Sequence, residues 1–214
     1  MKEIFVSPSI LSANLLNLQN EVNLLKQAGA NALHIDVMDG HFVKNISFGV
    51  PIVANLKKCG LPLDLHLMVT NPFNFIEIFA DAGADFLTFH VECSDNLKLC
   101  LKKARSLGCK AGVAVNPKTD ISCLSGFLND ESLLDLVVVM SVEPGFSGQS
   151  FIFDVLHKIS YVKSLNSSVD IAVDGGVNCK NSKLAVQAGA NWLIVGSTIF
   201  NSKNYSDVIE CLKH

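Results

Sequence analysis

Eight short apolar segments rich in β-branched residues recur along the chain, and segments with helical spacing separate them. Leu18, Val22 and Leu25, for example, would share one face of a helix. The run at 136–140 is apolar throughout, which is typical of a strand buried on both faces of a parallel sheet. This alternation favours an α/β fold, a closed (β/α)8 TIM barrel, over an open doubly wound sheet. The predicted strands are residues 4–11, 32–38, 63–68, 86–91, 111–115, 136–140, 169–173 and 192–195.

A short repeat, Ala-Gly-Ala followed by Asn or Asp, occurs at 28–31, 82–85 and 188–191. Each copy joins a predicted helix to the next predicted strand. Glycine suits the end of a helix, where the backbone takes a positive φ. The repeat therefore indicates equivalent corners at the stability face of the barrel. Functional residues are expected at the opposite rim, where the strands end.

The composition is typical of one large buried core. The chain has 214 residues, 49% hydrophobic content and a mean hydropathy of +0.35, which favours a single domain over 1–214. The net charge of -3 and a pI near 6.0 indicate no basic surface for nucleic acid. The start of the chain has no secretion signal, and no apolar run approaches the ~20 residues of a membrane helix. We expect a soluble, cytoplasmic protein without a membrane partner.

Cysteine usage bears on the same expectation. The seven cysteines are an odd number and show no Cys-x-x-Cys spacing. A disulfide framework or a zinc cluster of thiolates is therefore disfavoured, and we expect reduced cysteines.

Two predicted strands carry polar side chains at alternate positions of an apolar run. His34 and Asp36 lie in one strand, and Asp64 and His66 lie in the next. Residues two apart share a face of a strand, so each pattern points imidazole and carboxylate into one interior. Asp174, at the end of a later strand, adds a further carboxylate. Burying such groups costs several kcal/mol unless they are paired or bind a metal, so a metal or acid/base centre is indicated.

His34, Asp36, His66 and Asp174 form a set suited to one divalent cation at the C-terminal ends of three strands. Zinc is the favoured ion, and manganese, iron and cobalt are alternatives. For either histidine alone, a satisfied core residue is the alternative interpretation. Asp64 is expected about 6–7 Å deeper in the barrel than His66, where it could orient a ligand imidazole.

Two further groups have open roles. His90 and Glu92 end another predicted strand and either support the site from behind or touch the substrate or metal.

Met38, Met68 and Met140 occupy late inward positions on three strands. They either plug the barrel as adaptable core residues or form an apolar cap beside the reacting carbons.

Glycine-rich turns follow three consecutive late strands, at 143–149, 174–177 and 195–197. Bare backbone amides at such turns form a positive pocket suited to a phosphate, and TIM barrels often bind phosphate after strands seven and eight. Turn geometry alone is the alternative for any single turn. The chain lacks the GxxxxGK[ST] motif of a nucleotide P-loop. The candidate residues are Gly145, Phe146, Ser147, Gly148, Gly175, Gly176, Gly196 and Ser197.

Taken together, these motifs resemble the ribulose-phosphate 3-epimerase family along nearly the whole chain. The resemblance implies a (β/α)8 barrel that interconverts D-ribulose 5-phosphate and D-xylulose 5-phosphate in the pentose phosphate pathway. It also implies that the protein is a homo-oligomer and that its ligand is a small-molecule sugar phosphate. The matching motifs are Ser-Pro-Ser-Ile-Leu-Ser-Ala at 7–13, His-Ile-Asp-Val-Met-Asp-Gly-His-Phe-Val at 34–43, Asp-Leu-His-Leu-Met-Val at 64–69, Glu-Pro-Gly-Phe-Ser-Gly-Gln at 143–149, Val-Asp-Gly-Gly-Val at 173–177 and Gly-Ser at 196–197.

Residue roles follow from the same resemblance. It implies that His34, Asp36, His66 and Asp174 bind the metal and that the two aspartates transfer protons. Ser9 and His66 would touch the sugar, and the glycine-rich turns would hold its phosphate. Asp174, which begins one of these turns, is also a candidate substrate-binding residue. A serine between Pro8 and Ile10 could otherwise be a simple turn residue.

The chain departs from the family pattern at two positions. Ser147 stands where the family usually has glycine, and Lys44 follows Val43 where proline is common. Ser147 could crowd the phosphate loop or add a hydroxyl donor. We expect these changes to affect phosphate affinity rather than activity.

Three alternative functions compete with the five-carbon epimerase. An epimerase for a six-carbon ketose phosphate such as allulose 6-phosphate could share the metal and both carboxylates. Decarboxylation of a phosphorylated β-keto acid is disfavoured, because the inward strand positions considered show no lysine. A non-catalytic barrel that binds a sugar phosphate or a metal would not need two carboxylates at proton-transfer positions.

Overall fold

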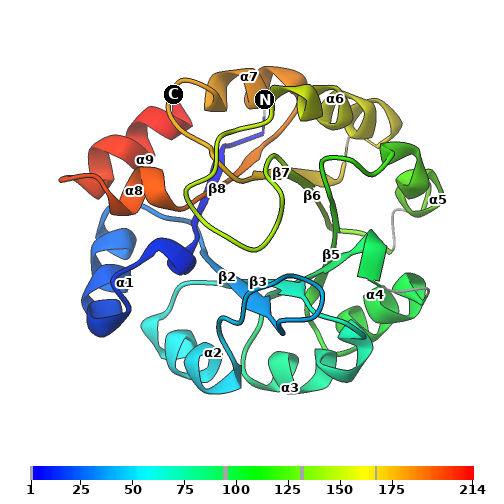
Figure 1. Cartoon of the computed structure of the whole chain (residues 1–214), viewed down its shortest axis with the longest axis horizontal. Helices are drawn as coiled ribbons and strands as arrows, with labels where there is room; N and C mark the ends of the chain where they lie inside the picture. The colour runs from blue at the N-terminus through cyan, green and yellow to red at the C-terminus, as the bar shows by residue number, and fades with distance from the viewer. Residues whose placement is uncertain (1, 94–95, 131–132, 167) are drawn as a thin grey trace.

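The computed structural model describes residues 2–93, 96–130, 133–166 and 168–214. Eight parallel strands form one sheet in the order β1-β8-β7-β6-β5-β4-β3-β2. A parallel bridge between Ser9 and His34 joins its two edges, so the sheet curls into the predicted single-domain TIM barrel (Figure 1). The strands are β1 Phe5–Pro8, β2 Leu33–Met38, β3 Leu63–Met68, β4 Phe86–His90, β5 Lys110–Val115, β6 Leu136–Met140, β7 Asp170–Asp174 and β8 Trp192–Val195.

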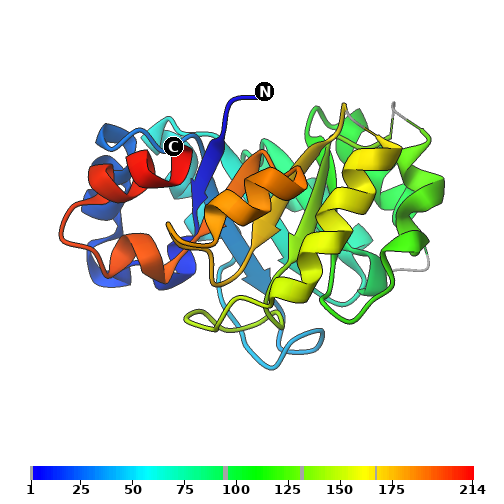
Figure 2. The ribbon, with the colours of Figure 1, turned by 90° about the horizontal axis from the view of Figure 1, so that it is seen from above.

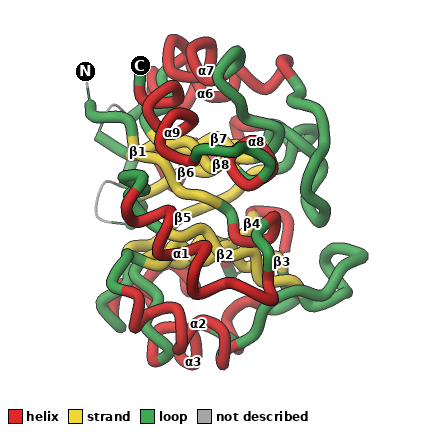
Figure 3. The backbone as a smooth tube through the Cα atoms, turned by 90° about the vertical axis from the view of Figure 1, so that its left-hand side faces the viewer, coloured by secondary structure: helices red, strands yellow, loops and turns green. Residues whose placement is uncertain are grey.

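Helices surround the strands, as Figure 1 shows from one end and Figure 3 shows from the side. The spacing of apolar residues explains this placement. In α1, for instance, Val22 and Leu25 are buried while most of the helix faces solvent. The helices are α1 Leu18–Gln27, α2 Val50–Leu56, α3 Ile76–Asp81, α4 Leu97–Ser106, α5 Ser125–Leu128, α6 Leu156–Leu165, α7 Ser182–Ala188, α8 Ser197–Phe200 and α9 Tyr205–Lys213.

Most strand positions agree with the prediction, and the first strand differs the most. The apolar run at 4–11 predicted one strand, but β1 ends at Pro8 and a 3-10 turn occupies Ile10–Ser12. Ser9 N still donates to Val195 O of β8 at 3.0 Å, so pairing continues one residue past Pro8 before the chain enters the 3-10 turn. This turn carries Ser9 and Ser12 across the mouth of the barrel, where both line the central pocket.

The Ala-Gly-Ala corners lie where helices turn into strands, as predicted. Gly29, Gly83 and Gly189 have φ values of 86°, 105° and 122°, which glycine adopts without strain. The fourth residue of each repeat accepts a backbone N–H of a neighbouring strand, as Asn31 Oδ1 does from Val6 N at 2.9 Å. The repeat therefore also anchors neighbouring strands near their N-terminal ends.

The expectation of seven reduced cysteines is wrong for one pair. Cys179 and Cys211 form a disulfide, with their Cα atoms 5.9 Å apart. They are 32 residues apart in the sequence, in the loop after β7 and in α9, so only the tertiary structure brings them together. The other five cysteines form no disulfide among the described residues.

No helix among the described residues is long and apolar enough to cross a membrane.

Candidate active site

The register between β2 and β3 brings the polar strand residues together. Asp36 pairs with His66 across the two strands, and His34 pairs with Asp64. Successive positions of this register lie at successive depths in the barrel, with Met38 opposite Met68 at the rim. Alternating positions thus form two polar layers beneath a layer of methionine.

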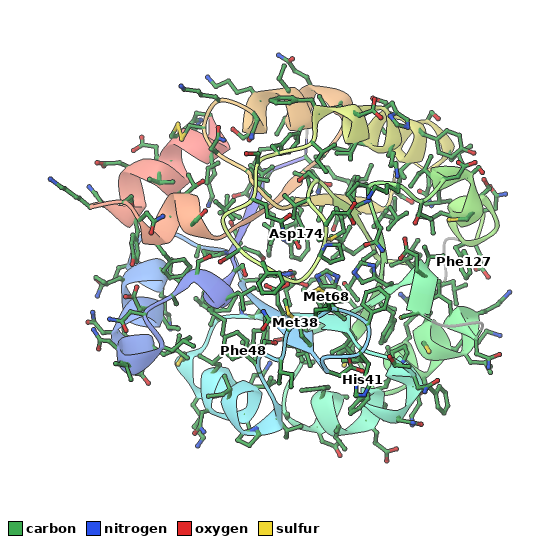
Figure 4. All side chains as sticks on the ribbon, in the orientation of Figure 1. Met38, His41, Phe48, Met68, Phe127 and Asp174 are labelled. Carbon is green, nitrogen blue, oxygen red and sulfur yellow. A yellow bond between two sulfur atoms is a disulfide. The ribbon has the colours of Figure 1, made fainter. Side chains whose placement is uncertain are left out.

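Asp174, the last residue of β7, completes a four-residue cluster. Figure 4 shows its side chain near the barrel centre with Met38 and Met68. One ligand atom from each of His34, Asp36, His66 and Asp174 lies within 4.8 Å of the other three. His34 Nε2 is 3.3 Å from Asp36 Oδ1 and 3.8 Å from Asp174 Oδ2. The corresponding distances from His66 Nδ1 are 3.4 and 3.6 Å.

The two imidazole nitrogens that face the carboxylates test whether a metal fits here. His34 Nε2 and His66 Nδ1 are buried and have no hydrogen-bond partner among the described residues. Buried polar atoms are rarely left unpaired, because losing hydration costs free energy. Two nitrogen and two carboxylate donors that converge in this way form a candidate site for one divalent cation.

The electrostatics of the cluster agree with this interpretation. Burial by itself would lower the pKa of the His34 imidazole, but the carboxylates of Asp64 and Asp36 raise it well above its usual value. For Asp36, burial would raise the pKa, and the imidazoles of His34 and His66 lower it instead. The carboxylates thus favour a positive charge between them, which imidazole protons or a divalent cation can supply.

The cluster lies deeper than the sequence suggested. The prediction placed all four residues at the C-terminal ends of strands. This is wrong for His34, the second residue of β2, and for Asp36 and His66, the fourth residues of β2 and β3, and it holds for Asp174, the last residue of β7. Both histidines are fully buried beneath Met38 and Met68. The strand pattern shows which residues share a face, but not how far each lies from the rim.

Asp64 has the predicted supporting position. Its Oδ2 atom is 2.7 Å from His34 Nδ1, on the side of the ring away from Asp36 and Asp174. A carboxylate at this point orients the imidazole and makes it a more basic ligand.

A pocket with an empty volume of about 540 Å³, including its open mouth, lies above the cluster. Asp36 and Asp174 are largely buried but line this pocket, and Ser9 Oγ donates a hydrogen bond of 2.6 Å to Asp36 Oδ2. Every candidate substrate-binding residue except His66 lines this pocket: Ser9, Gly145, Phe146, Ser147, Gly148, Asp174, Gly175, Gly176, Gly196 and Ser197.

The glycine-rich turns meet on one wall of this pocket. Gly176 has a φ of 64°, and a Cβ atom there would lie 2.6 Å from the backbone nitrogen of Phe151. The close approach of the turns after β6 and β7 therefore requires glycine at this position. Gly196 precedes α8, so the amides at the start of that helix lie on the same wall.

Two long loops project from the side of the barrel away from the N-terminus (Figure 2). They follow β2 and β6, and Asn45 Nδ2 donates a 2.8 Å hydrogen bond from the first loop to Gly145 O in the second. Phe146, at the tip of the second loop, is 59% exposed. Ser147 is exposed as well, so it does not crowd the loop backbone.

The sequence analysis missed Ser12 as a pocket residue. Its Oγ atom is buried without a hydrogen-bond partner among the described residues, and it lies where a Cβ atom on Gly196 would be only 2.6 Å away. The residue was part of the quoted motif at 7–13, but nothing local shows that a 3-10 turn carries it to Gly196.

His90 and Glu92 support the cluster from behind. His90 Nε2 is 2.8 Å from His66 Nε2, and His90 Nδ1 is 3.0 Å from Glu92 Oε2. Burial lowers the pKa of His90 to about 4. Burial opposes ionisation of Glu92, yet hydrogen bonds from His90, Thr119 and Asn116 lower its pKa to about 2. Neither residue lines the pocket.

Comparison with known proteins supports the fold and identifies the family. The family model described as the ribulose-phosphate 3 epimerase family matches residues 5–200. The ribulose-phosphate 3-epimerase of Bacillus subtilis is 43% identical over 212 residues, which cover 96% of each chain. The cytoplasmic isoform of this enzyme in Oryza sativa subsp. japonica is 39% identical over 210 residues, which cover 97% of this chain and 92% of the rice protein.

A solved structure shows the same fold at much lower identity. KGPDC from Streptococcus mutans aligns with a TM-score of 0.72 and 13% identity, covering 99% of this chain and 96% of its own. The assignment to a family rests on the match over residues 5–200 and on the identity to relatives over nearly their full length. This chain belongs to the ribulose-phosphate 3-epimerase family, whose members are isomerases.

Proposed function

We propose that the protein interconverts D-ribulose 5-phosphate and D-xylulose 5-phosphate by proton transfer at C3. The observation that carries this proposal is the pair of carboxylates, Asp36 and Asp174, at the floor of one pocket beside two unpartnered imidazole nitrogens. Epimerisation needs a base on one face of the carbon and an acid on the other, and two carboxylates can exchange these roles with reaction direction.

Each aspartate has one oxygen toward the imidazoles. Asp36 Oδ1 and Asp174 Oδ2 face His34 and His66. The other oxygen of Asp36 accepts the Ser9 hydroxyl, which holds the carboxylate in a single orientation. We assign Asp36 and Asp174 as the proton donor and acceptor on opposite faces of C3, in the order that the direction of reaction requires.

His34, Asp36, His66 and Asp174 would hold the divalent metal. Zinc is the proposed ion on the basis of the nitrogen and oxygen donors, with manganese, iron and cobalt as alternatives. When bound, such an ion supplies Lewis-acid stabilisation of the negative charge that develops on the substrate oxygens. Met38, Met68 and Met140 line the pocket beside the aspartates and exclude water from the reacting carbons.

The glycine-rich wall would bind the substrate phosphate. Backbone amides after β6, β7 and β8 form this wall, and Ser197 and Ser12 add hydroxyl groups. Phosphate bound at this wall orients C3 toward the aspartates without taking part in the chemistry. We further propose that the protein works in the pentose phosphate pathway, in the cytoplasm, and as a homo-oligomer.

Proton NMR of D-ribulose 5-phosphate in D2O, with purified zinc-loaded protein, tests the reaction. We expect deuterium at C3 together with xylulose 5-phosphate. Asp36→Asn and Asp174→Asn should each lower turnover by at least about 1,000-fold, because each removes one proton-transfer group. Asp81→Asn, on the exposed end of α3, is the matched control. Near-normal rates in both active-site variants would refute the assignment.

Assays with other substrates distinguish the competing activities. Higher catalytic efficiency with allulose 6-phosphate would replace the five-carbon substrate by the six-carbon one. Release of carbon dioxide from a phosphorylated β-keto acid would favour a decarboxylase. The only lysine among the described strand residues is Lys110, which is exposed, so the structure offers no support for that chemistry.

A further inference from the structure

The two histidines of the cluster present opposite ring nitrogens to the aspartates. His34 does so through Nε2 and His66 through Nδ1. A nitrogen that binds a cation must offer its lone pair, so a neutral imidazole then carries its proton on the other nitrogen. His34 would be protonated on Nδ1, next to Asp64, and His66 on Nε2, next to His90. The two ligands therefore need opposite tautomers.

The contacts behind His66 permit one order of donors and acceptors. If His66 Nε2 donates, then His90 Nε2, at 2.8 Å, must accept. A neutral His90 that accepts at Nε2 carries its proton on Nδ1, which lies 3.0 Å from Glu92 Oε2. Glu92 is a carboxylate without a donor group, so it can only accept the hydrogen bond from His90 Nδ1. Glu92 thus sets the donor and acceptor of each hydrogen bond in the series from Glu92 through His90 to His66.

Glu92 is itself held by the loop after β5. Its Oε1 atom accepts hydrogen bonds from Asn116 N at 2.8 Å and Thr119 Oγ1 at 2.5 Å. Lys158, buried on α6, donates to the carbonyl oxygens of Asn116 and Pro117 at 2.9 and 2.6 Å and also to that of Thr119. An outer helix therefore anchors the loop, and the loop fixes the carboxylate.

We propose that His90 and Glu92 are positioning residues that set the tautomer and ring orientation of His66, and through it the metal affinity of the cluster. This inference rests on the metal site of the proposed function. Neither residue lines the pocket, so direct contact with substrate is not their role. His66 differs from His34 in that its supporting partner is a neutral ring, and the carboxylate acts one residue further away.

Zinc affinity, measured by competition with a chromophoric chelator, tests the inference without any turnover. His90→Leu should weaken zinc binding about 10- to 100-fold, because it leaves His66 without an acceptor. His90→Gln should retain most of the affinity, since its side-chain oxygen can accept the same proton. His157→Gln, an exposed histidine on α6, is the matched control and should bind zinc as the wild type does.

NMR of protein labelled with 15N-histidine gives a second, direct readout. In the zinc-loaded wild type we expect His34 protonated on Nδ1 and His66 on Nε2. Circular dichroism checks that each variant is folded. Wild-type zinc affinity in folded His90→Leu, or the same tautomer at His34 and His66, would overturn the inference while leaving the proposed function intact. A wild type that binds no zinc would overturn the proposed metal site and this inference with it.

Discussion

Ser9 controls the orientation of Asp36 through a single hydroxyl group. The hydrogen bond from its Oγ to Asp36 Oδ2 is 2.6 Å long and buried. Hydrogen bonds to charged groups contribute about 1.5–3 kcal/mol, so Ser9→Ala should lower kcat/KM about 10- to 100-fold. Steady-state kinetics with D-ribulose 5-phosphate measures this.

The matched control for Ser9 is Ser106→Ala on the outside of α4, where the hydroxyl donates to Lys103 O of its own helix. It should leave the kinetics unchanged. If Ser9→Ala keeps kcat/KM within twofold of the wild type, the proposed role of the hydroxyl is wrong.

At the scale of residues, the sequence identified which polar side chains meet in the barrel but not how deep they lie. Period-two patterns correctly placed His34 with Asp36, and Asp64 with His66, on inward faces, because side-chain alternation is a local property of a strand. Whether His34 meets Asp64 or solvent depends on the register of β2 against β3. The partner of His90 and the place of Ser12 depend on several elements at once, so neither could be read from the chain.

At the scale of elements, the loops after β2 and β6 are joined by the side chain of Asn45. Its amide donates to Gly145 O, and a Cβ atom on Gly145 would lie 3.3 Å from Val43 Cβ. Asn45→Ala removes a hydrogen bond worth about 1 kcal/mol, so KM should rise about fivefold with little change in kcat. Hydrogen exchange of the peptide spanning 143–149 should also become faster.

Asn55→Ala provides the control for this tether. Asn55 Nδ2 also donates to a backbone carbonyl, but to Pro51 O within α2. Neither KM nor exchange at 143–149 should change in this variant. Unchanged exchange in Asn45→Ala as well would show that the hydrogen bond does not restrain the second loop.

The order of elements was predicted more fully than their boundaries. β3, β6 and β8 begin and end at the predicted residues. The runs of β6 and β8 have polar or glycine limits, whereas β3 is preceded by Pro62 and followed by Val69. The first run was predicted too long, because the apolar residues beyond Pro8 belong to a 3-10 turn. Apolar character alone does not distinguish a strand from a buried turn that follows it.

At the scale of the whole molecule, metal binding should stabilise the fold, because the four candidate ligands come from three strands that are distant in sequence. A ligand present at 100 times its Kd adds about 2.7 kcal/mol to the free energy of unfolding. For a domain of this size that corresponds to a rise in Tm of about 5–10 °C, measurable by calorimetry with and without zinc.

The double variant Asp36→Asn with Asp174→Asn should lose this rise in Tm, because it removes both carboxylate ligands. A chelator should also return the zinc-treated wild type to the Tm of the untreated protein. An equal rise in the double variant would show that zinc binds elsewhere.

The sequence by itself determined the alternation of eight strands and helices, the glycine corners, the polar residues of the site and the family, because all of these depend on local periodicity or short motifs. Only the tertiary structure decided that His34 and His66 lie beneath the methionines, that each ring has its own supporting partner, and that Cys179 meets Cys211. These features depend on strand register and on loops that meet across the barrel. Such contacts join residues far apart in sequence, so no local pattern encodes them.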